Sequence, residues 1–163
     1  MGRGYVESVL RDRDPEYVKL LVTFSSPWEG HRWAAVGTRY ALNPVPSWFD
    51  LSPKSKFLVS LREPLQRDGH RIPHYVFFGF RRTPSLVMTE SSDGVIAMGS
   101  QLPLWVQDQA ERYWGYDVEH TAILSNRGAL ERYERLLRSE ADRLRRDGPD
   151  HRSLQGNASL VID

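Results

Sequence analysis

The chain has 163 residues, a length that suits one domain and lets folding bury about two thirds of the extended surface. Its 40% apolar and 26% charged residues are typical of a globular protein and exclude a disordered one. The 22 basic and 21 acidic side chains leave a net charge of +1, so bulk charge gives no reason to expect nucleic acid or an anionic membrane as a partner.

The absence of Cys excludes disulfides, thiolate metal sites and a cysteine nucleophile. Residues 1–5 contain no apolar run of signal-peptide length, and no stretch approaches the roughly 20 apolar residues of a membrane span. We therefore expect the chain as written to be cytoplasmic, with no transmembrane segment. If the protein starts further upstream, its compartment is unknown.

The first elements expected are a helix and a buried strand. Apolar residues at helical spacing predict a short amphipathic helix over residues 4–13, which Asp14 and Pro15 end. Residues 17–24 form a nearly continuous apolar and β-branched run, which is typical of a strand covered on both faces. The sequence Ser25-Ser26-Pro27 predicts a loop after it.

Residues 28–71 have four prolines, many aromatic residues and no long periodicity, which indicates an insertion with short helices. Residues 55–61 are its best helical segment. Residues 74–80 return to the composition of a buried strand, and a weaker strand is expected over residues 110–115.

A helix is expected to close the folded region. Apolar residues three or four apart predict it over residues 127–145, and residues 146–163 are expected to form a flexible tail. The arginines of this helix alternate with acidic residues, which favours a solvated face over nucleic-acid binding. Strands separated by helical segments predict an α/β fold with a mainly parallel sheet and flanking helices.

Two short motifs follow the predicted strands. Asp93-Gly94-Val95-Ile96 comes after the strand at residues 74–80, and His120 lies in a polar loop between the weaker strand and the closing helix. Upstream, residues 17–30 read as a core strand followed by a Ser-Ser-Pro turn and Gly30. In this order and spacing the motifs resemble the C-terminal part of an α/β-hydrolase of the lipase and esterase type.

The resemblance implies chemistry for both motifs. In this family the triad runs in the order Ser, acid, His, so Asp93 would be the acid and His120 the general base. The start Met1-Gly2-Arg3-Gly4 matches the family's nucleophile turn from its second residue, so the serine would precede Met1. The N–H of Met1 would form part of the oxyanion hole in the parent enzyme.

The resemblance also implies an organisation and a substrate. Residues 1–145 would be the C-terminal portion of the hydrolase domain, with residues 28–71 as a cap-like insertion. The substrate would be a small-molecule carboxylic ester or lipid, bound without a cofactor. Aromatic side chains of the insertion would form a substrate wall: Trp28, Trp33, Trp48 and Phe49.

Other interpretations compete with this one. The chain could be a non-catalytic hydrolase relic that binds a ligand or partner, and a second copy or another protein would then cover an exposed sheet edge. Asp93, Glu119 and His120 match no metal-binding spacing, so no metal site is expected. Ser25 and Ser26 lack a Gly-x-Ser-x-Gly context, so we interpret them as a structural loop.

Overall fold

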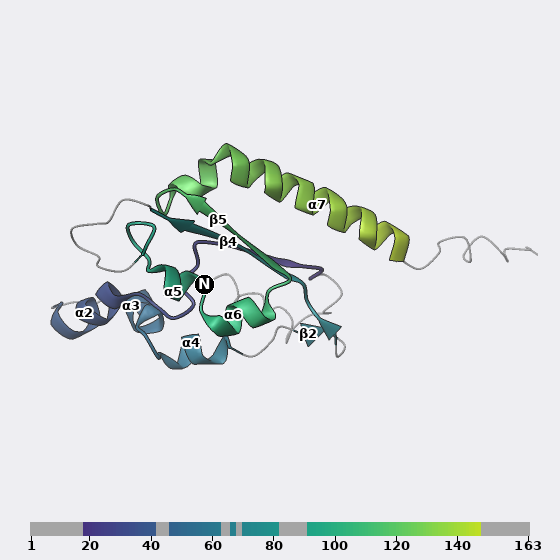
Figure 1. Ribbon diagram of the computed structural model, residues 1–163. Coiled ribbons are helices and arrows are strands. Elements are labelled where there is room, and N and C mark those ends of the chain that lie inside the picture. The colour runs from purple at the N-terminus through teal and green to yellow at the C-terminus, as the bar shows by residue number, and fades with distance from the viewer. Residues whose placement is uncertain (1–17, 42–45, 63–65, 68–69, 82–90, 148–163) are drawn as a thin grey trace, which may run out of the picture. The chain divides into compact units, whose positions relative to one another are not determined.

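The computed structural model of the chain describes residues 18–41, 46–62, 66–67, 70–81 and 91–147 (Figure 1). The helix expected at residues 4–13 and the tail from residue 148 onward lie outside the described residues. The chain divides into two compact units, Met1–Ala129 and Leu130–Asp163. The first unit contains the sheets and all the short helices.

The described part of the chain belongs to the α/β class, because helices separate the strands of a small parallel sheet. The elements in chain order are β1 Leu21–Phe24, α2 Arg32–Tyr40, α3 Pro46–Leu51, α4 Lys56–Ser60, β2 Gln66–Arg67, β3 His70–Arg71, β4 His74–Phe80, α5 Met98–Gln101, α6 Leu104–Gln109, β5 Arg112–Asp117, the 3-10 helix η2 Ala122–Ser125 and α7 Arg127–Asp147.

The main sheet has three parallel strands in the order β1-β4-β5, so β4 is central. The strand predicted at residues 74–80 is confirmed as β4, with its first four residues buried. The first strand is shorter than predicted and begins at Leu21, where the ladder pairs Leu21 with His74. Pro73 precedes that pair and has no N–H to donate, so the sheet ladder starts there.

The third strand, β5, begins two residues later than expected because helix α6 extends to Gln109. The helical segment predicted at residues 55–61 is confirmed as α4, and Ser55 caps it by accepting a hydrogen bond from Leu58 N–H at 3.1 Å. The closing helix is also confirmed, as α7, and it continues to Asp147. Ion pairs within α7 join residues three or four apart, such as Arg138 and Glu134.

The two faces of β4 are packed differently. Within the first unit, helices α4 and α6 lie on one side of the sheet (Figure 1). On that side Val76 joins a buried cluster with Trp28, Leu58, Leu61 and Val106. On the other face the fully buried ring of Phe77 lies against aromatic rings of β1 and β5, namely Phe24, Trp114 and Tyr116. Burial of these large rings stabilises the sheet, so the loops at its carboxyl end start from well-packed strands.

Candidate acid and histidine site

Asp93 lies in a tight turn of residues 91–98, the acid loop, which follows β4 in the chain and leads into α5. Its side chain is fully buried, and its Oδ1 accepts hydrogen bonds from Val95 N–H at 3.0 Å and Ile96 N–H at 2.7 Å. An aspartate that accepts from backbone N–H groups two and three residues later stabilises such a turn. Gly94 has a φ of 92°, which favours glycine and explains the Asp-Gly pair.

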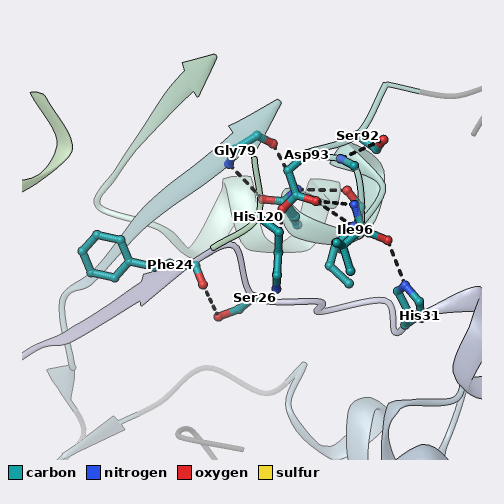
Figure 2. Close-up of polar contacts among 11 residues, drawn as sticks. Phe24, Ser26, His31, Gly79, Ser92, Asp93, Ile96 and His120 are labelled. Carbon is teal, nitrogen blue, oxygen red and sulfur yellow. Dashed lines mark hydrogen bonds and ion pairs between the residues drawn. The ribbon is translucent and has the colours of Figure 1, made fainter. Parts of the chain in front are cut away.

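His120 lies in residues 118–121, the histidine loop, which follows β5. Its Nδ1 is 2.7 Å from Asp93 Oδ2, and its backbone N–H donates to the Asp93 carbonyl at 3.1 Å (Figure 2). A carboxylate only accepts, so Nδ1 carries the hydrogen and Nε2 of a neutral ring has a free lone pair. The His120 side chain is 30% exposed, whereas that of Asp93 is not exposed at all.

The pKa of Asp93 reflects two opposed influences. Burial is the largest single influence and raises the pKa, because a buried carboxylate is poorly solvated. The hydrogen bond from His120, the two backbone hydrogen bonds and the attraction to the His120 ring lower it, and together they outweigh burial. The pKa therefore lies below that of an ordinary aspartate, and Asp93 is ionised at neutral pH.

The parallel sheet explains why two loops so distant in sequence meet. Strands β4 and β5 are neighbours that run in the same direction, so the loops after them leave from the same edge. Gly79 on β4 allows the acid loop to approach closely. A Cβ atom on Gly79 would lie only 3.0 Å from Asp93 Cβ, 3.2 Å from Val118 O and 3.3 Å from Ser25 Oγ.

The two serines after β1 differ from each other. Ser25 has a φ of 42°, is 3% exposed, and its hydroxyl has no hydrogen-bond partner among the described residues. The Ser26 hydroxyl donates to Phe24 O at 3.4 Å. Neither hydroxyl bonds to His120, whose side-chain hydrogen bond in the described part of the chain leads to Asp93. A hydroxyl as buried as that of Ser25 is also poorly placed to attack a substrate.

The aromatic residues expected to form a substrate wall lie in different environments. Trp28 is 4% exposed and belongs to the core cluster, although its ring also lines a pocket of about 200 Å³ beside β1. Trp48 is partly exposed and Phe49 is 55% exposed, and neither lines this pocket. The side chain of Trp33 lies outside the described residues, as does Met1.

The pocket lies beside β1 and the helices that follow it. Its lining is mostly apolar and comes from β1, the turn after it, α3 and α4: Leu21, Val22, Thr23, Phe24, Ser26, Pro27, Trp28, Leu51, Phe57, Leu58 and Leu61. Such a lining suits an apolar group and offers few polar atoms for recognition.

Three contacts around the acid loop were not predicted from the sequence. His31 Nε2 is 2.8 Å from Val95 O, so the start of the cap-like segment touches the acid loop (Figure 2). Gln101 bonds to the backbone of β4 and of the acid loop. Arg81 at the end of β4 forms an exposed ion pair with Glu119 in the histidine loop. No motif marks these residues, because each acts through backbone atoms or a single surface pair.

Among the described residues there is neither a candidate metal site nor a candidate membrane-spanning helix. No group of three or more His, Cys, Asp or Glu side chains among those residues could hold a metal ion. No helix in those residues combines the length and the apolar character needed to cross a bilayer.

Comparison with known proteins found no relative of this chain. No family model matches the chain, and neither a curated protein nor a solved structure matches it.

Proposed function

We propose that Asp93 and His120 are the acid and general base of a serine hydrolase of the α/β-hydrolase superfamily, acting on carboxylic ester or lipid acyl bonds. One observation carries this proposal: a fully buried aspartate holds the Nδ1 atom of a partly exposed histidine at 2.7 Å. A buried carboxylate fixes the tautomer and orientation of the ring and stabilises its cation, which is the role of the acid in a catalytic triad.

The fold supports the proposal in a second way. The acid follows the central strand and the histidine follows its neighbour, in the chain order that the resemblance implies. The helices between β1 and β4 lie in the segment that the resemblance implies to be a cap, and the apolar pocket that β1, α3 and α4 line suits an acyl chain. No cofactor is required by this chemistry.

The reaction follows from the free ring nitrogen. His120 Nε2 takes the proton of a serine hydroxyl as that oxygen attacks the acyl carbonyl, and later gives the proton to the departing alcohol. Asp93 remains ionised throughout. The resemblance implies that this serine precedes Met1 in a longer protein, and the 163-residue chain would then carry two of the three triad residues.

The test begins with the DNA upstream of the Met1 codon. If codons for Gly-x-Ser lie in frame, the longer protein is expressed and its hydrolysis of p-nitrophenyl esters is measured, together with labelling by a fluorophosphonate probe. His120→Ala and Asp93→Asn should each lower kcat by about 10³-fold or more. Asp108→Asn, at an exposed position of α6, is the matched control and should retain activity.

The 163-residue chain alone is expected to show neither labelling nor ester hydrolysis. Full activity of the His120→Ala variant would contradict the proposal. A folded longer protein that hydrolyses no ester and takes up no probe would instead favour a non-catalytic protein that binds a ligand or partner.

A further inference from the structure

Gln101 is the last residue of α5 and is fully buried. Its Oε1 accepts from Gly79 N–H at 3.0 Å, and its Nε2 donates to Gly79 O at 3.0 Å and to Ile96 O at 3.1 Å. A buried amide without partners would destabilise the fold, but both polar atoms of this one are bonded. One side chain thus joins β4 to the acid loop.

The backbone of Gly79 needs this partner because β1 ends early. The last residue pair between the two strands is Phe24 with Phe77, and Ser25 N–H donates to Phe77 O at 2.8 Å before the chain turns away. Backbone groups two residues apart in a strand point to the same side. The N–H and C=O of Gly79 therefore face the side that β1 has left, and Gln101 takes the place of a strand residue there.

The same amide also bonds to Ile96, whose backbone holds Asp93. The carbonyl of Ile96 accepts from Gln101 Nε2 at 3.1 Å and from Asp93 N–H at 3.2 Å. The N–H of Ile96 donates to Asp93 Oδ1 at 2.7 Å. Because Oδ1 is fixed by the loop in this way, Oδ2 is directed at His120 Nδ1.

We propose that Gln101 is a positioning residue for the Asp93–His120 pair: its amide fastens the acid loop to the unpaired end of β4 and so holds Asp93 Oδ2 at His120. The importance of this role for catalysis rests on the proposed function. The positioning itself does not, because it can be measured in a chain that turns over no substrate.

The experiment compares Gln101→Met with Ser100→Ala in the 163-residue chain. Methionine has a similar length and removes all three hydrogen bonds. Ser100 is the neighbouring residue, is also buried, and donates to Gly30 O at 2.6 Å rather than to the acid loop. Both variants should lower the free energy of unfolding, so stability alone does not distinguish them.

Two NMR signals distinguish positioning from a structural role. In the wild type, titration of the Asp93 side-chain carbon should give a pKa below that of an ordinary aspartate, and the His120 Nδ1 proton should give a downfield resonance that exchanges slowly with water. In Gln101→Met we expect the pKa of Asp93 to rise and the His120 resonance to be lost. In Ser100→Ala both signals should match those of the wild type.

The proposal is overturned if Gln101→Met unfolds more easily but keeps both signals unchanged. Should this variant fail to fold, hydrogen exchange in the wild type decides instead. The Nε2 protons of Gln101 and the amide proton of Ile96 should be protected to a similar degree, since one opening event exposes both. Exchange of the Gln101 protons more than about tenfold faster than that of Ile96 would also overturn it.

Catalytic failure is separable from these outcomes. If the longer protein is inactive while the NMR results are as expected, the positioning role stands and the proposed function fails. If the longer protein is active, Gln101→Met should lower kcat by about tenfold to a hundredfold with little change in KM, because a misplaced acid affects the reaction more than binding.

Discussion

The acid loop and the histidine loop meet at one hydrogen bond but are held in different ways. In the acid loop the side chain of Asp93 is fully buried, two backbone N–H groups fix Oδ1, and Gln101 and His31 contact the loop from two other segments. In the histidine loop, His120 is 30% exposed, and both its ring Nδ1 and its backbone N–H bond to Asp93. The fold therefore positions the acid, whereas the acid positions the histidine.

The largest expected effect comes from removing the acid. Asp93→Ala removes the acceptor of the Val95 and Ile96 N–H groups, of which that of Ile96 is buried, and should lower the free energy of unfolding by about 3 kcal/mol. His120→Ala should cost only about 1 kcal/mol, because water can reach Asp93 Oδ2 at the partly exposed site. Urea denaturation of both variants measures the difference, and equal losses would show that the two loops are held alike.

A smaller effect is expected from the strand beneath the acid loop. Gly79→Ala places a Cβ 3.0 Å from Asp93 Cβ and close to backbone atoms, and should lower the free energy of unfolding by about 1–3 kcal/mol. Gly99 in α5 is the matched control, since nothing lies within 4 Å of its added Cβ. Gly99→Ala should leave stability unchanged or raise it by about 0.5–1 kcal/mol. A Gly79→Ala variant as stable as the wild type would mean that the acid loop can shift away from the added Cβ atom without loss of stability.

The smallest effect expected is on the pH dependence of stability. The pKa of Asp93 is lower in the folded chain than in the unfolded chain, so its contribution is fully present above the ordinary aspartate pKa of about 3.9. That contribution is lost as pH falls from there through the lower pKa of the folded state.

Urea denaturation between pH 6 and pH 3 tests this dependence. Asp93→Asn should weaken the fall in the free energy of unfolding at the acid end of this range. Asp108→Asn, which changes an exposed carboxyl group on α6, serves as the control and should follow the wild type. An Asp93→Asn variant whose pH profile is the same as that of the wild type would mean that Asp93 titrates alike in both states.

Patterns in the sequence predict the elements that local chemistry determines. The apolar run at residues 74–80 is sufficient to identify β4, and the spacing of apolar residues identifies α7. The position of Ser55 predicts the start of α4 because its hydroxyl caps the helix. The order of Asp93 and His120, each after a strand, is enough to predict that the two residues form a pair.

Other features depend on contacts between distant segments. The start of β1 is set by the position of Pro73 just before the partner strand β4, and the start of β5 by the end of α6. Helices as short as α5 are not stable alone, so packing rather than propensity decides whether they form. The role of Gln101 depends on β1 ending before β4 does, which no local pattern around Gln101 records.

The parallel sheet also determines when this site can form during folding. Each strand pair joins residues far apart in sequence, such as Leu21 with His74 and Tyr75 with Arg112, so long loops must close before either pair is stable. Asp93 lies between the two later strands, and His120 comes after the last of them. During synthesis, the hydrogen bond between them is therefore one of the last contacts to appear, after β5 has docked on β4.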